Sequence, residues 1–219
     1  MNKKIKTVFV CSECGFESAK WNGICPSCGQ GNTMLEEIRE SSSKQSKLGG
    51  VKFSPSQVSQ VSMNSIDIDE ETRYCTGFNE LDRVFGGGIV KGSLTLLGGT
   101  PGIGKSTLLL QICNNLDKKL KILYVSGEES KRQIKMRASR LGVCNENLFI
   151  MTETNINLIA AEIEYTRPDL VIIDSVQTMS NPESSTFPGS VSQVKECTNI
   201  FLKLSKSLDI TVLLIGHVN

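Results

Sequence analysis

Apolar residues in the second half of the chain occur in short runs that alternate with helical patterns. Five runs have the length and composition of buried strands, and they cover 94–98, 121–126, 147–151, 169–174 and 211–216. Apolar positions three and four residues apart predict helices over 105–116, 130–141, 155–165 and 191–208. Because strands that alternate with helices form mainly parallel sheets, this half of the chain predicts an α/β fold.

The pattern changes before residue 73. Residues 1–34 contain short strand-like pieces and turns, with too few apolar positions for a hydrophobic core of their own. Residues 35–72 are rich in Ser, Gln and Lys, a composition that is typical of a linker. We therefore expect three parts, which are a small N-terminal unit (1–34), a Ser-rich linker (35–72) and an α/β domain (73–219).

Charge and hydropathy narrow the classes of function. The chain carries 24 Lys plus Arg against 23 Asp plus Glu, a net charge of +1, so any contact with nucleic acid must come from local patches. The longest apolar stretches, such as 170–173 and 212–215, are too short to span a bilayer. The N-terminus lacks the long apolar region of a signal peptide. The sequence predicts a cytoplasmic protein without a membrane partner.

Four of the eight cysteines form two Cys-x-x-Cys pairs near the N-terminus, and each pair is followed by glycine. The pairs are Cys11 with Cys14 and Cys25 with Cys28. Two such pairs complete a tetrahedral shell, which predicts a zinc ribbon with a structural Zn²⁺; four unrelated reduced thiols are the alternative. The other cysteines stand singly, and we interpret Cys75, Cys113, Cys144 and Cys197 as buried thiols.

A glycine-rich segment links the strand predicted at 94–98 to the helix predicted at 105–116. Its residues 99–106 match Gly-x-x-x-x-Gly-Lys-Ser/Thr in the context that a P-loop requires. The predicted nucleotide-binding residues are Gly99, Thr100, Pro101, Gly102, Ile103, Gly104, Lys105, Ser106 and Thr107. We expect Lys105 to reach the β and γ phosphates of ATP and the Ser106 hydroxyl to ligate Mg²⁺. A glycine-rich turn without nucleotide is the alternative.

Acidic residues and a histidine stand at the ends of other predicted strands. Asp174 ends the fourth apolar run, where a Walker B carboxylate would hold the Mg²⁺ shell. Glu128 and Glu129 follow the second run, and either could orient or deprotonate the attacking water. Glu129 fits better as a residue that favours the start of the next helix. His217 follows the last run and is either a γ-phosphate sensor or structural.

Two further segments have open interpretations. The helix predicted at 130–141 carries five cations without an acid, at Lys131, Arg132, Lys135, Arg137 and Arg140. Their spread around the helix favours a solvated surface over a nucleic-acid site. The polar loop 179–188 either contacts a partner or is a passive connection.

The order of these motifs resembles the RadA (Sms) family of bacterial DNA repair proteins. The resemblance is carried by the four cysteines with Trp21-Asn22-Gly23, by the P-loop, and by the segments 76–90, 124–130 and 188–197. It covers the whole chain except the linker. Two departures are Gly31, where family members usually carry Trp, and the end of the sequence before the family's Lys-Asn-Arg-Phe-Gly motif and Lon-protease-like domain. From the second departure we expect a truncated chain.

The resemblance implies a RecA-like ATPase that forms a homo-hexameric ring on single-stranded DNA and drives branch migration with RecA. It implies catalytic roles for Lys105 and Glu128, a γ-phosphate sensor at His217 and a DNA-contacting loop after Asp174. It also implies the strand order 3-2-4-5-1, counted from the run at 94–98. Two alternatives remain, a nucleotide-responsive adaptor that binds DNA or RecA without turnover, and a zinc-ribbon nucleic-acid module whose P-loop only stabilises the fold.

Overall fold

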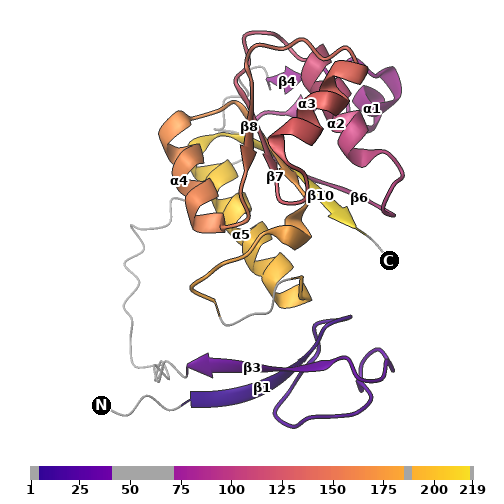
Figure 1. The fold of residues 1–219 in the computed structure, drawn as a ribbon, viewed down its shortest axis with the longest axis vertical. Coiled ribbons are helices and arrows are strands. Elements are labelled where there is room, and N and C mark those ends of the chain that lie inside the picture. Colours follow the sequence, from indigo (N-terminus) through magenta and orange to yellow (C-terminus); the bar gives the residue numbers. More distant parts are fainter. Residues whose placement is uncertain (1–4, 41–71, 185–188, 218–219) are drawn as a thin grey trace, which may run out of the picture.

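The computed structural model describes residues 5–40, 72–184 and 189–217 (Figure 1). Most of the predicted linker, and residues 185–188 of the predicted loop, lie outside the described residues. Within the described part, a small antiparallel sheet precedes a larger parallel one, and the hydrophobic pattern predicts the parallel sheet.

The N-terminal sheet has the order β2-β1-β3. Its strands are β1 (Ile5–Cys11), β2 (Glu17–Ser18) and β3 (Met34–Glu40). β3 pairs with β1 from the Cys11–Met34 pair to the Ile5–Glu40 pair, so it uses the full length of its partner. The predicted end of this unit at residue 34 is therefore wrong, because β3 begins at Met34 and continues to Glu40 as the partner of β1.

The larger sheet has five parallel strands in the described part of the chain, in the order β6-β10-β9-β7-β8. These strands are β6 (Leu94–Gly99), β7 (Ile122–Ser126), β8 (Leu148–Thr152), β9 (Leu170–Asp174) and β10 (Thr211–His217). When β6 to β10 are numbered 1 to 5 along the chain and the sheet is read from β8, the order is 3-2-4-5-1. The predicted α/β fold and its strand order are thus confirmed.

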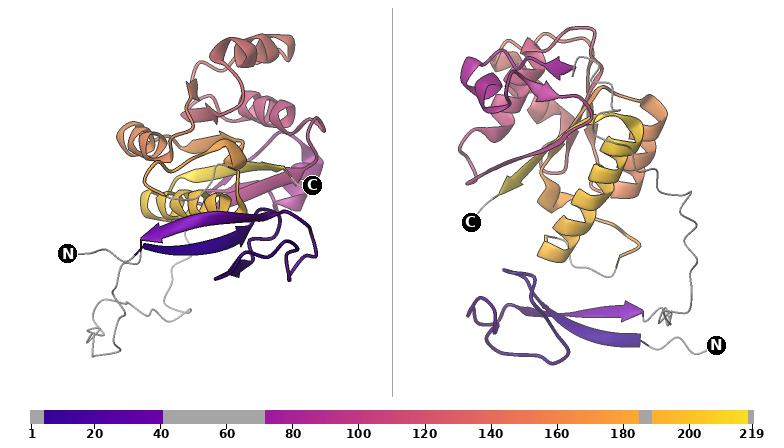
Figure 2. Two further views of the ribbon diagram at one scale, coloured as in Figure 1. Left: turned by 60° about the horizontal axis from the view of Figure 1, so that its bottom comes forward. Right: turned by 180° about the vertical axis from the view of Figure 1, so that it is seen from behind.

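Helices cover both faces of this sheet (Figure 2). They are α2 (Lys105–Asn115), α3 (Lys131–Arg140), α4 (Ile156–Thr166) and α5 (Val191–Leu208), with a 3-10 turn η3 (Val176–Thr178) after β9. Along β7, Ile122 and Tyr124 pack with α2 and α3, whereas Leu123 and Val125 pack with α4 and α5. Every residue of β7 and β9 is buried. Because both faces are covered, the central strands are continuous apolar runs.

Three short elements before β6 were not predicted. They are β4 (Arg73–Tyr74), α1 (Asn79–Val84) and β5 (Ile89–Val90), of which β4 and β5 pair antiparallel. Elements of two to six residues are too short to show a period. Asp82 on α1 accepts hydrogen bonds from the Thr76 amide and hydroxyl, both at 2.8 Å, which ties the entry segment to the helix.

The single cysteines divide into two groups. Cys113 and Cys197 are buried as expected, but Cys75 and Cys144 are exposed, so the prediction is wrong for these two. Both exposed thiols lie in connecting segments, which run over the surface. Among the described residues, no helix has the length and apolar character needed to cross a membrane.

Candidate functional site

The P-loop turns from β6 into α2 at Gly104, which precedes Lys105 and has φ 104°. Gly102 has φ 79°, so two of the loop's residues adopt a left-handed conformation that glycine tolerates best. The Lys105 side chain folds back over the loop, and its Nζ donates to the carbonyls of Gly99 at 2.7 Å and Thr100 at 2.9 Å. Backbone N–H groups and a cation therefore gather at the start of α2, which is the arrangement that binds phosphate.

A cavity of about 360 Å³ lies at this helix start. It is lined by Pro101, Gly102, Gly104, Lys105, Ser106, Thr107, Glu128, Glu129, Arg137 and His217. The residues outside the P-loop come from the ends of β7 and β10 and from α3. Ligands of parallel α/β sheets bind outside the carboxyl ends of the strands, and this cavity lies there. Every predicted catalytic residue lines it, as do six of the nine predicted P-loop residues, Lys105 included.

A chain of polar contacts crosses the cavity from Glu128 to Lys105. The Ser175 hydroxyl donates to Glu128 Oε1 at 2.7 Å, and His217 Nε2 lies 3.2 Å from the same oxygen. On the other side of the imidazole, Nδ1 lies 3.3 Å from Lys105 Nζ. The Ser175 hydrogen bond and the neighbouring His217 and Lys105 lower the pKa of Glu128 below its usual range, against an opposing effect of burial. Glu128 is therefore an ionised carboxylate at neutral pH.

Asp174 is buried at the end of β9 and accepts a hydrogen bond from the Tyr124 hydroxyl on the neighbouring strand β7. Burial, followed by the charge of Asp174, raises the pKa of Tyr124, so the phenol remains a donor. Sequence reasoning missed Tyr124 because a tyrosine in an apolar strand looks like an ordinary core residue. It also missed Ser175, for which the sequence offers no signal.

Glu129 forms an ion pair with Arg137 of α3. The start of α3 is capped by Ser130, which forms a capping box with Gln133, so Glu129 is not needed as the cap. Arg137 was predicted to be part of a solvated helix surface, and for this residue the prediction is wrong. The burial of Ile134 and Ala138 turns the intervening Arg137 toward the cavity.

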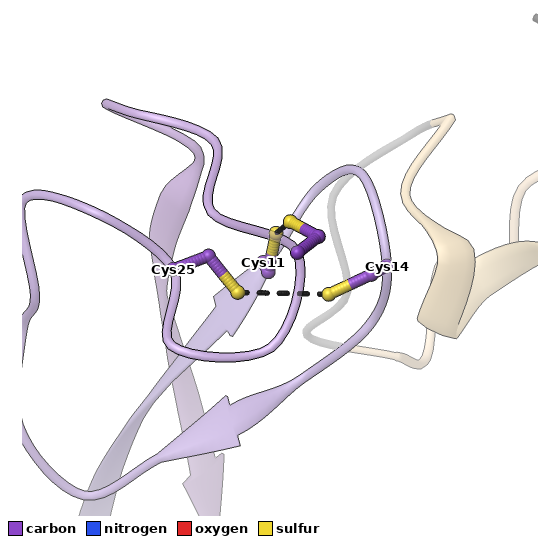
Figure 3. A group of neighbouring side chains, drawn as sticks. Cys11, Cys14 and Cys25 are labelled. Atoms are coloured by element: carbon purple, nitrogen blue, oxygen red, sulfur yellow. Dashed lines mark hydrogen bonds between the residues drawn. The ribbon is translucent and has the colours of Figure 1, made fainter.

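The four predicted metal-ligating cysteines lie together at one end of the N-terminal sheet. Figure 3 labels three of them, Cys11, Cys14 and Cys25. All four Sγ atoms are within 4.8 Å of one another, and the Cys11–Cys28 and Cys14–Cys25 pairs are each 3.6 Å apart. A tetrahedral Zn²⁺ with Zn–S bonds of about 2.3 Å separates its sulfurs by about 3.8 Å. The thiols are thus already at the spacing of a closed zinc shell, and they fit this ion.

The protonation of this cluster is uneven. Burial favours the neutral thiol of Cys11, but its hydrogen bonds with the Thr33 hydroxyl and with two backbone amides outweigh it and lower its pKa to about 6. For Cys28, the Gln30 amide favours the thiolate, but burial and the neighbouring thiols prevail and raise its pKa to about 12. Four thiolates repel one another, and a divalent cation is what removes that repulsion.

A parallel sheet with a glycine-rich loop after its first strand and a buried aspartate at the end of another defines a P-loop nucleotide-binding domain. Residues 67–219 match the AAA domain family, and residues 9–36 match the rubredoxin metal binding domain. The chain belongs to the AAA domain family.

Curated relatives agree with this assignment. The chain is 46% identical to the DNA repair protein RadA of Halalkalibacterium halodurans, 45% to that of Bacillus subtilis and 47% to that of Chlamydia muridarum, in each case over 98% of its length. These similarities confirm the family resemblance found in the sequence. The chain spans 47%, 47% and 46% of these three relatives, which is about half their length.

Proposed function

We propose that this chain binds and hydrolyses ATP as part of a DNA repair protein. The observation that carries the proposal is the contact chain Ser175–Glu128–His217–Lys105, which joins an ionised carboxylate to the phosphate-binding lysine across one cavity. A carboxylate held ionised beside the phosphate site is what a general base for hydrolysis requires.

In this proposal, the nucleotide is bound by residues of α2 and by residues at the ends of three strands. The P-loop amides and Lys105 hold the phosphates, and Lys105 exchanges its two carbonyl partners for phosphate oxygens. Mg²⁺, when bound, would neutralise charge on the β and γ phosphates. Ser106 and Asp174 would hold it, and the Tyr124 hydroxyl fixes the orientation of the Asp174 carboxylate.

Glu128 is the proposed general base. Its lowered pKa keeps it able to orient a water molecule and to accept its proton. His217 lies between Glu128 and Lys105, so a γ-phosphate that draws Lys105 away also changes the contacts of the imidazole. The contact between His217 and Glu128 would therefore depend on whether a γ-phosphate is bound.

We also propose that Cys11, Cys14, Cys25 and Cys28 hold one structural Zn²⁺. The N-terminal sheet has little core to replace it, since the buried cluster there consists of Cys11, Cys25 and Met34 among the described residues. All four ligand positions of a tetrahedral ion are taken by sulfur, so the metal would have no open position for catalysis.

The names of the relatives support DNA repair as the setting for this ATPase. For the whole protein we propose binding of single-stranded DNA, branch migration together with RecA, and assembly into a hexameric ring. The support for these finer roles is the family resemblance of the motifs. The segment after Asp174, described up to residue 184, is the proposed DNA contact.

ATP hydrolysis with and without single-stranded DNA tests the proposal on this chain. Glu128→Gln should bind ATP normally but lower the rate of hydrolysis by about 10²- to 10⁴-fold, the usual contribution of a general base. The matched control is Glu164→Gln, because Glu164 is exposed on α4 and does not line the cavity. Wild-type chain that binds ATP but hydrolyses it no faster than Glu128→Gln would instead support the adaptor.

A further inference from the structure

One arginine of α3 differs from the other cations of its helix. All of α3 lies within the described residues, and Lys131, Arg132, Lys135 and Arg140 are exposed on it. The Arg137 side chain is only 20% exposed and lines the cavity at the P-loop. Among the described residues that line this cavity, Lys105 is the only other lysine or arginine. The cavity therefore has a second permanent cation, which comes from a different element.

The partner of Arg137 lines the same cavity. Glu129 pairs with the guanidinium, and its own side chain is 26% exposed. An ion pair on an open surface contributes little and needs no explanation. This pair instead lines the same cavity as Lys105 and Ser106, where a nucleotide would bring several negative charges. A phosphate chain and the Glu129 carboxylate would compete for one guanidinium.

We propose that Arg137 is a phosphate-binding residue of the nucleotide site, and that Glu129 holds its guanidinium in the cavity until the nucleotide replaces this carboxylate. This inference rests on the proposed function, since it assigns a further contact to the same site. The planar guanidinium fork forms paired hydrogen bonds with phosphate oxygens, which a lysine does not reproduce. Holding the fork in place beforehand reduces the entropy lost on binding.

The alternative is that the pair only braces α3 against the end of β7. The two ideas predict opposite effects of losing the Glu129 charge on ATP binding. If Arg137 exchanges partners, loss of the arginine weakens ATP binding, while loss of the Glu129 charge removes both a competitor and a repulsive neighbour of the phosphates. If the pair is only a brace, either change loosens the site, and both weaken binding alike.

Titration calorimetry with ATP on the 219-residue chain separates the two. Arg137→Gln should raise the Kd for ATP by about tenfold or more, the usual effect of losing a charged hydrogen bond. Glu129→Gln should bind ATP at least as tightly as wild type. Arg137→Lys should recover only part of the loss. The matched control, Arg132→Gln, removes an exposed cation of the same helix and should bind like wild type.

Two outcomes would overturn the inference. One is an unchanged Kd in Arg137→Gln, and the other is an equal loss in Arg137→Gln and Glu129→Gln. Thermal unfolding without nucleotide identifies a variant that has merely lost its fold. If Arg137→Gln does so, the Kd values for ATP of Arg137→Lys and Glu129→Gln are compared instead: weaker binding in Arg137→Lys alone supports the inference, and an equal loss in both overturns it. Lys105→Ala in the same series separates this inference from the proposed function. If wild type binds ATP and Lys105→Ala does not, the nucleotide site stands whatever Arg137 does; if wild type fails to bind, both proposals fall.

Discussion

The N-terminal four-cysteine unit and the parallel α/β domain hold their chemical groups in place by different physical means. Among the described residues, the first has a buried cluster of three residues, whereas the second has two clusters of 16 and 15 residues, one on each face of the sheet. The cysteines of the first unit are themselves most of its core. In the α/β domain, the polar residues stand at strand ends, outside the core that positions them.

This difference separates what each part can do. A unit whose core is its ligand set cannot vary those ligands without losing its fold, so its metal is structural. A domain with two apolar layers can keep a buried carboxylate, an ionised glutamate and two cations around one cavity, because hydrophobic burial supplies its stability independently.

Removal of zinc should unfold the N-terminal unit and leave the α/β domain intact. Structural zinc contributes about 10–16 kcal/mol of apparent binding free energy in small zinc domains, far more than a buried cluster of three residues can replace. Hydrogen exchange after chelation should show loss of protection in residues 5–40 only. Metal analysis should find one zinc per chain in wild type and in the control Cys144→Ser, and none in Cys14→Ser. Full zinc in Cys14→Ser would contradict the assignment.

Shortening a buried side chain of a central strand should destabilise the α/β domain and leave the N-terminal unit intact. Ile172 is fully buried in β9, and Ile172→Ala should lower the free energy of unfolding of the α/β domain by about 2–5 kcal/mol. Its zinc content should not change. Leu158→Ala on α4 is the control, because Leu158 is 52% exposed and its loss should cost under about 0.5 kcal/mol. Equal effects of the two substitutions would mean that the sheet does not support the site as described.

The smallest effect concerns the acid titration of Glu128. The Ser175 hydrogen bond is the largest cause that lowers its folded-state pKa below the ordinary value of 4.5. This bond therefore contributes stability above pH 4.5, and the contribution is lost as the pH falls through the lowered folded-state pKa. In Ser175→Ala, the pKa of Glu128 should rise toward 4.5, as measured by NMR of the side-chain carboxyl carbon. An unchanged pKa of Glu128 in Ser175→Ala would show that Ser175 does not hold this carboxylate.

The sequence by itself determined the parts of this protein that depend on spacing along the chain. The apolar runs give β6 to β10 within one residue at each end, because buried parallel strands have a continuous hydrophobic pattern. Residues 99–106 predicted a turn that begins a helix at Lys105, and the structure has it there. The two Cys-x-x-Cys pairs predicted one cluster, since two residues between thiols fix their distance within a turn.

Only the tertiary structure decided which side chains face the cavity. Arg137 has the same residue type and helix as Arg132 and Arg140, and the sequence does not show which of them faces the ends of the strands. The separation comes from the contact of Ile134 and Ala138 with the core, which fixes the rotation of α3 about its axis. The same holds for Tyr124, whose hydroxyl meets Asp174 because β7 and β9 are neighbours in register, 50 residues apart in the chain. A local pattern encodes how a segment folds, but contact between segments depends on the packing that brings them together.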